Sequence, residues 1–126
     1  MSELHGSPHQ RKMIAEINAP FKPALIVLDG IDAFVDEGPA VGKRAKGNVF
    51  LASNDRVAID AVGVAVLKSL GSNKQIMGSK IFDQEQIARA AEIGLGASSS
   101  SDIELLAADD QSIEYKNNIQ DILNNG

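Results

Sequence analysis

The sequence contains no cysteine and no tryptophan. Without cysteine, the chain cannot form disulfides, thiolate nucleophiles, zinc–thiolate sites or cysteine-ligated iron–sulfur clusters. Aromatic residues are scarce, with one Tyr and four Phe, so platforms on which single-stranded nucleic acids stack are not expected. The basic residues are scattered and the net charge is −5. Because a duplex-binding face needs clustered Lys and Arg, we expect no nucleic-acid partner.

Long hydrophobic runs are also missing. No apolar stretch approaches the roughly 20 residues of a membrane-spanning helix, and the start of the chain lacks the apolar core of a signal peptide. We therefore expect no membrane partner. The lack of cysteine fits a cytoplasmic location.

The apolar residues that are present predict alternating strands and helices. Continuous aliphatic runs indicate strands at 24–29 and 48–53, and a third strand is predicted at 102–107. Helical spacing predicts helices within 9–21, 54–71 and 82–96, the last with Asp83 and Gln86 as a capping box. Such alternation is typical of α/β structure.

We therefore predict an α/β fold, with a small mixed or mostly parallel sheet of three or more strands flanked by helices. A single α/β domain is expected over residues 1–108, and residues 109–126 are expected to form a tail that contains a helix. A sheet of three strands is thin. Either further strands exist, or another chain or a missing segment completes it.

The segment from Gly30 to Gly47 is predicted to be a long loop, and loops of that length are often functional. In open α/β sheets, ligands bind where strands end and helices begin. Residues at such positions are candidate ligand-binding residues: Asp29, Gly30, Glu37, Gly38, Pro39, Asp55 and Asp60. Asp29, Asp55 and Asp60 would supply oxygen ligands to a divalent cation such as Mg²⁺. The alternative, which spacing alone favours, is that Asp29 and Asp55 form turns and caps and that Glu37 is solvated.

Asp60 is the only charged residue between Val57 and Leu67. A buried carboxylate is costly unless it is paired or hydrogen-bonded. Asp60 therefore either binds a ligand, or pairs with Arg56 or the loop backbone, and the sequence leaves both interpretations open.

Two other motifs give weaker evidence for a functional site. His5 and His9 have no third ligand residue nearby and are predicted to be exposed. Gly38 and Gly42 are one residue too close for a phosphate-binding P-loop, and Arg44 replaces its hydroxyl residue. We identify no catalytic residues, so the sequence does not decide whether the chain is an enzyme.

The order of the motifs resembles the C-terminal part of the family named domain of unknown function 362. The matching pieces are "ELH" at Glu3–His5, "LDGI" at Leu28–Ile31, "EGP" at Glu37–Pro39 and "ASNDRVAIDAVG" at Ala52–Gly63, within a resemblance from Ser2 to Ala107. By this resemblance Asp29, Gly30, Gly38, Pro39, Asp55 and Asp60 are the best site candidates. Arg56 stands where the family usually has proline.

The resemblance implies a redox-associated family whose members often carry ferredoxin-like cysteine motifs. This chain has no cysteine, so an iron–sulfur cluster is not carried over, and the upstream half of the family domain is expected to be missing. We predict a ligand- or cofactor-binding domain with an acidic crevice at the strand ends. Two alternatives are a structural domain that forms homo-oligomers or binds a partner supplying the missing part, and an enzyme whose catalytic residues lie mostly in that part.

Overall fold

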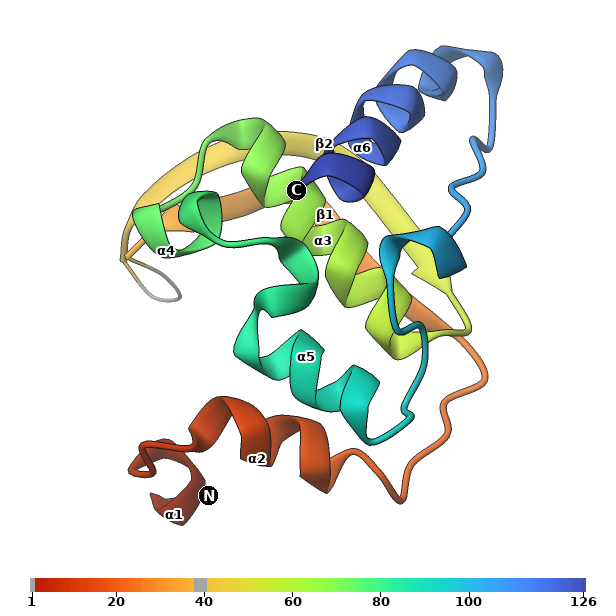
Figure 1. The fold of residues 1–126 in the computed structure, drawn as a ribbon. Helices are drawn as coiled ribbons and strands as arrows, with labels where there is room; N and C mark the ends of the chain where they lie inside the picture. Colours follow the sequence, from red (N-terminus) through yellow and green to blue (C-terminus); the bar gives the residue numbers. More distant parts are fainter. Residues whose placement is uncertain (1, 38–40) are drawn as a thin grey trace.

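A curved hairpin of two strands packs against one long helix, the later helices pack around that helix, and the two N-terminal helices lie outside them (Figure 1). The computed structural model describes residues 2–37 and 41–126. In chain order, the helices and strands are α1 (Ser2–His5), α2 (Gln10–Ile17), β1 (Ile26–Asp36), β2 (Lys43–Ser53), α3 (Arg56–Leu70), α4 (Lys74–Gly78), α5 (Glu85–Glu92) and α6 (Ile113–Asn125). Short 3-10 helices occupy η1 (Ile81–Asp83), η2 (Ser100–Asp102) and η3 (Asp110–Ser112).

The sheet differs from the prediction. β1 and β2 pair antiparallel, from Ile26 opposite Ser53 to Asp36 opposite Lys43, and they are the only strands in residues 2–37 and 41–126. The predicted mixed or mostly parallel sheet of three or more strands is therefore wrong. The fold is mixed α/β, with one antiparallel hairpin.

Most of the predicted loop between Gly30 and Gly47 belongs to this hairpin, because β1 continues to Asp36 and β2 begins at Lys43. Charged residues are tolerated there since one face of an antiparallel hairpin is open to water. The pairing also shifts between Gly30 and Asp32, as at a β-bulge. That shift breaks the period of two on which strand prediction depends.

The predicted third strand, at 102–107, is likewise absent from the structure. η2 ends at Asp102, and the following residues run as coil. The Leu105 N–H donates to Gln120 Oε1 at 3.0 Å, and Gln120 Nε2 donates to the Ile103 carbonyl at 3.5 Å. A side-chain amide on α6 thus takes backbone partners that a neighbouring strand would supply.

The predicted helix over 54–71 is confirmed as α3, which forms the centre of the fold. Small and β-branched side chains make it apolar on most sides, with Ala61 and Ala65 fully buried. One side of α3 packs against the hairpin. At Gly63 an added Cβ would lie 3.1 Å from Leu28 Cδ1, so glycine at this position allows β1 to approach the helix closely.

The opposite side of α3 forms the main core with the later helices. Ile81, Ile87, Ile119 and Leu123 pack with α3 residues in one buried cluster. Burial of each such side chain contributes about 1.5–3 kcal/mol to folding. The predicted helix within 82–96 is confirmed as α5, but its cap is not: α5 begins at Glu85, and Gln84 at its N-cap makes no side-chain capping bond.

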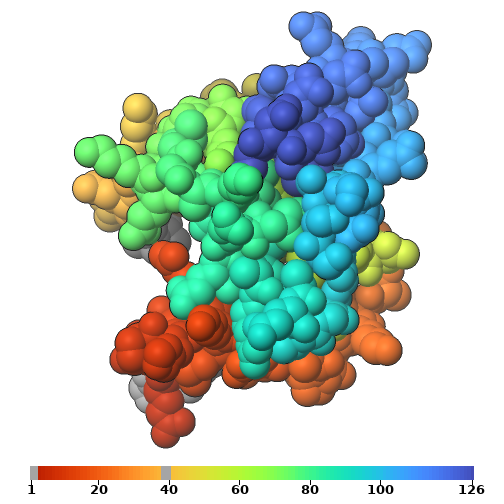
Figure 2. All heavy atoms as spheres, in the orientation of Figure 1, coloured from red at the N-terminus to blue at the C-terminus, as the bar shows by residue number. Residues whose placement is uncertain are grey.

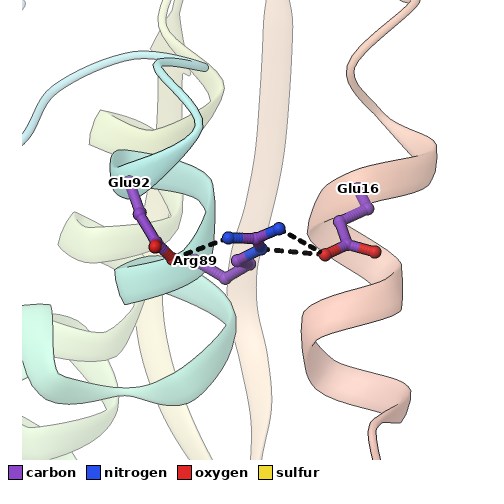
Figure 3. A network of polar contacts seen from close by, with 3 residues as sticks. All are labelled: Glu16, Arg89 and Glu92. Carbon is purple, nitrogen blue, oxygen red and sulfur yellow. Dashed lines mark hydrogen bonds and ion pairs between the residues drawn. The ribbon is translucent and has the colours of Figure 1, made fainter.

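α2 packs on the outer side of α5 (Figure 1). Arg89 of α5 forms an ion pair with Glu16 of α2 at 2.7 Å and a second pair with Glu92 at 2.8 Å (Figure 3). These pairs raise the pKa of Arg89 and lower that of Glu92 through their hydrogen bonds. They lie at the surface, where ion pairs add little to stability.

Arg56 makes a second connection to the N-terminal segment. Its Nη1 donates to the carbonyls of Asn18 and Phe21, each at 2.5 Å, and its Nε donates to the Leu95 carbonyl at 3.3 Å. The Arg56 guanidinium therefore connects the start of α3 to the segment that follows α2 and to the segment that follows α5.

No helix in the described residues combines the length and the apolar character needed to cross a membrane. The division of the chain at residue 108 stays a prediction. In the structure α6, which lies in the predicted tail, packs against α3.

Candidate functional site

A cavity of about 500 Å³ lies between β1, α3, α4 and the start of α5. β1 contributes two runs of consecutive residues, 28–30 and 32–34, whereas β2 contributes none. Side chains alternate between the two faces of a strand, so consecutive lining residues mean that β1 borders the cavity with its edge. This is the edge that no strand in the described residues pairs with. Figure 2 shows the surface hollowed between α4 and the N-terminal helices.

Asp60 reaches this cavity from α3. Partial burial raises the pKa of its carboxyl above the usual value of 3.8, and a hydrogen bond with Gln86 acts in the opposite direction. Asp60 is exposed to solvent and lines the cavity, so the residue is accessible although the surrounding protein disfavours its charge. The ionised form would gain from a bound positive charge.

A second cavity, of about 240 Å³, lies between α2, α3 and α5. Asp60, Gln86 and Ile87 line both cavities. Asp60 therefore stands at the junction of two neighbouring hollows, one bordered by the β1 edge and the other by α2.

The larger cavity combines acidic groups with apolar walls. Its acidic residues are Asp29, Asp32, Asp60 and Glu85, against the single basic residue Arg11. The Arg11 guanidinium donates to Gln75 Oε1 at 3.5 Å. Side-chain amides supply further donors and acceptors, and the apolar lining includes Leu28, Phe34, Leu67, Ile76 and Ile87. Such a lining suits a ligand with positive charge or several N–H or O–H donors, joined to an apolar part.

Asp29 and Gly30 lie at the strand edge of the cavity, as two of the predicted site residues. One carboxylate oxygen of Asp29 accepts from the Ile31 N–H at 3.0 Å. This local bond to the backbone two residues later is of the kind expected for the alternative role of Asp29, in which it forms a turn. Its second oxygen makes no hydrogen bond within the described residues.

Asp55 has a structural role. Its Oδ1 accepts from the N–H groups of Val57 and Ala58, each at 2.9 Å, and its Oδ2 accepts from Ala97 N–H at 2.8 Å. Asp55 thus caps α3 and ties the segment after α5 to the start of that helix. A Cβ at Gly96 would lie 2.1 Å from Asp55 Oδ1, so glycine there leaves room for the carboxylate. Asp55 lines neither of the cavities that Asp60 borders.

Of the remaining predicted site residues, the structure describes Glu37, which directly follows β1. Glu37 is exposed, has a φ of 54°, and its N–H donates to Asp36 Oδ1 at 3.1 Å. Gly38 and Pro39 lie outside the described residues. Glu37 does not line the larger cavity.

The structure brings Asp29 and Asp60 to one cavity and places Asp55 elsewhere. Within residues 2–37 and 41–126, no group of three or more His, Asp or Glu residues is arranged to hold a metal ion. The assignment of Asp29, Asp55 and Asp60 as joint metal ligands gains no support from this arrangement and stays a prediction.

Sequence reasoning missed the residues that the later helices bring to the cavity, among them Gln86 and Glu85 of α5 and Gln75 of α4. Gln86 was predicted to close a capping box, but it lies beside Asp60. The sequence offered one weak indication of this position. Helical periodicity predicts that Ile87 is buried, and Gln86 is the residue next to it in α5.

The fold and the cavity together define a mixed α/β domain with an acidic hollow at a strand edge. The family model described as "Domain of unknown function (DUF362)" matches residues 1–65, just over half of the 126 residues. The chain belongs to this family, as the order of its motifs indicated. The match includes Asp29, Asp55 and Asp60 and ends within α3, before the end of the resemblance expected at Ala107.

No curated protein and no solved structure matches the chain. α4 and α5, which complete the larger cavity, lie beyond the family match.

Proposed function

We propose that this chain binds a small cationic ligand in the cavity bordered by β1, α3, α4 and α5. The observation that carries the proposal is the position of Asp60, an accessible carboxyl at the junction of two cavities. Concave sites with apolar walls and a few convergent polar groups are the usual form of small-molecule sites.

The charge of the lining favours a cation over an anion. Four acidic residues and one basic residue border the larger cavity. An anionic ligand would face repulsion from these carboxylates. A cation near Asp60 would offset the energetic cost that partial burial places on its ionised form.

Two sources can supply the positive charge. An organic ammonium group with an apolar part would use both Asp60 and walls such as Leu67 and Ile76. A divalent cation would use carboxylate oxygens and water, with Asp29 and Asp60 as the predicted ligand residues that line the same cavity. The apolar share of the lining favours the ammonium compound.

The experiment is a titration of ¹⁵N-labelled protein with a panel of alkyl and aryl ammonium compounds, and separately with Mg²⁺ and Mn²⁺. We expect saturable amide shifts in 28–34, 60–67 and 84–87 with at least one ammonium compound. Asp60→Asn should abolish these shifts, whereas Asp121→Asn, which changes an exposed carboxylate on α6, should leave them unchanged. Shifts that persist in Asp60→Asn would contradict the assigned anchor.

The redox association is implied by the family resemblance alone, and a cytoplasmic location stays an expectation from the lack of cysteine. The proposed ligand class depends on neither. A response to Mg²⁺ or Mn²⁺ alone would identify the cation as a metal ion and exclude the ammonium version.

A further inference from the structure

The two cavities share one pair of polar side chains. Asp60 and Gln86 line both the larger cavity, of about 500 Å³, and the smaller one, of about 240 Å³. The third shared residue is Ile87, whose side chain is buried in the core. A charged group bound between Asp60 and Gln86 would therefore have one cavity toward β1 and α4 and the other toward α2.

The smaller cavity is apolar away from this pair. Its other polar residues are Asn18 and Arg56, and both are bonded to the main chain. The Asn18 amide donates to the Ile14 carbonyl at 2.7 Å, and the Arg56 guanidinium donates to three carbonyls. The rest of the lining is apolar, with Ile14 of α2, Val57 of α3 and Ala90 of α5 among its walls. This cavity therefore offers a ligand mainly hydrocarbon surface.

We propose that the ligand is a secondary ammonium compound, with its nitrogen between Asp60 and Gln86 and one apolar arm in each cavity. The bulkier arm lies in the larger cavity, against walls such as Leu67 and Ile76. The shorter arm enters the smaller cavity between α2, α3 and α5. This inference rests on the proposed binding of a cation at Asp60 and names the chemical class of that cation.

The acceptors that the two cavities share favour a secondary nitrogen. The Gln86 amide donates a hydrogen bond to the Asp60 carboxyl, and the same amide has a carbonyl oxygen that can accept one. One carboxylate and one amide oxygen match the two N–H groups of a secondary ammonium. A primary ammonium would turn its third N–H toward an apolar wall, where a donor without an acceptor is costly.

Arg56 restricts the chemistry of the shorter arm. It precedes Asp60 by four residues, about 6 Å along α3, and it lines the smaller cavity but not the larger one. A second positive charge on this arm would be repelled by the guanidinium. The arm is therefore uncharged, and a diamine should bind more weakly than the matching monoamine.

The first test compares amines that share one arm. Benzylamine and its N-methyl, N-ethyl and N-propyl derivatives are titrated into the ¹⁵N-labelled full chain. We expect Kd to fall about three- to fourfold for each added carbon until the smaller cavity is filled, and amide shifts to spread to 14–18 and 90–95. N-(3-aminopropyl)benzylamine, whose longer arm ends in a second ammonium, should lose this gain. A Kd that stays constant along the series would overturn the inference.

The second test locates the shorter arm. Ala90→Leu enlarges a wall of the smaller cavity, and the matched control Ala88→Leu makes the same change on α5 at a residue that lines neither cavity. The ratio of Kd between benzylamine and N-propylbenzylamine should fall toward one in Ala90→Leu and keep its wild-type value in Ala88→Leu. A wild-type ratio in folded Ala90→Leu would overturn the inference.

A measurement on the wild type does not depend on the folding of either variant. Nuclear Overhauser contacts are expected between the propyl methyl group of the bound amine and the Ile14 and Ala90 methyl groups, which line the smaller cavity. Binding of N-propylbenzylamine without these contacts would place the arm elsewhere and overturn the inference.

The two proposals fail in different ways. Benzylamine binding that is lost in Asp60→Asn, with no gain from the second arm, would support the proposed function and reject the two-armed ligand. If no amine, in this series or in the wider panel, binds in a way that depends on Asp60, both proposals are wrong.

Discussion

Asp55 and Asp60 lie five residues apart at the start of α3, and the structure gives them different roles. Asp55 satisfies three backbone N–H groups. Asp60 points to two cavities, with its charged form disfavoured by partial burial. The same residue type therefore stabilises the fold at one position and is free to meet a ligand at the other.

Substitution of Asp55 should destabilise the protein. Asp55→Ala removes the acceptor for two N–H groups at the start of α3 and one at Ala97. Loss of such a cap costs about 0.5–2 kcal/mol, and we expect a loss of about 2 kcal/mol in the free energy of unfolding, measured with urea. Asp55→Asn, which keeps an acceptor oxygen, should lose less. Equal losses in both variants would argue that the carboxylate acts through its charge.

The stability of the protein should depend on the ionisation of Asp60. Its raised pKa means that the folded state binds a proton more tightly than the unfolded state. This contribution is fully present below pH 3.8, the ordinary pKa of the group, and is lost as the pH rises through the raised value. We therefore expect Asp60→Asn to match the wild type in acid and to become relatively more stable above that window. The opposite trend in unfolding free energy against pH would mean that the pKa is lowered in the folded protein.

At the scale of elements, one side chain of α3 helps to position α2, together with the packing of α2 on α5. Arg56 binds the carbonyls of Asn18 and Phe21 after α2, and that of Leu95 after α5. These bonds hold α2 beside the smaller cavity, which Arg56 and Ala15 both line.

Replacing Arg56 should loosen α2 before it affects α3. For Arg56→Ala we expect a loss of about 1–2 kcal/mol and faster hydrogen exchange at amides 13–17, with little change at 61–66. Arg56→Lys keeps the charge but not the planar fork, so it should recover only part of the protection. Uniformly faster exchange across α2 and α3 would show instead that Arg56 supports the whole fold.

The elements that could be predicted from the sequence are those whose apolar residues repeat at a regular spacing. α3 and α5 were predicted because apolar residues such as Val62, Val66 and Ile87 repeat at helical spacing. The aliphatic runs predicted strands at 24–29 and 48–53, which belong to β1 and β2. The distal half of the hairpin was not predicted, because it carries charged residues on a face open to water and shifts register near Ile31. The segment 102–107 resembled a strand by composition, but the amide of Gln120 takes its backbone partners.

At the scale of the molecule, the candidate site is assembled from segments far apart in the sequence. The sequence could indicate Asp60, because a lone charge in an apolar helix is unusual. It could not indicate Gln86 or Gln75, since their approach to Asp60 depends on how α4 and α5 fold back over α3. The Asp55 carboxylate caps α3 and Asp29 lines the larger cavity, so a joint role for these two residues stays a prediction.

Binding in the cavity should stabilise the whole molecule. A ligand that binds only the folded state raises the free energy of unfolding by about 2.7 kcal/mol at a hundredfold excess over its Kd. We expect this increase, at an unchanged urea m-value, with an ammonium compound that shifts the 84–87 amides. An increase of equal size in Asp60→Asn would place the binding site elsewhere.

The most direct test of the account follows the Asp60 carboxyl itself. A ¹³C-detected pH titration of this group, with and without saturating ammonium ligand, measures its pKa in both states. The account predicts a value above 3.8 in the free protein, because of partial burial, and a lower value when the cation is bound. A pKa that stays the same on saturation would contradict binding of a cation at Asp60.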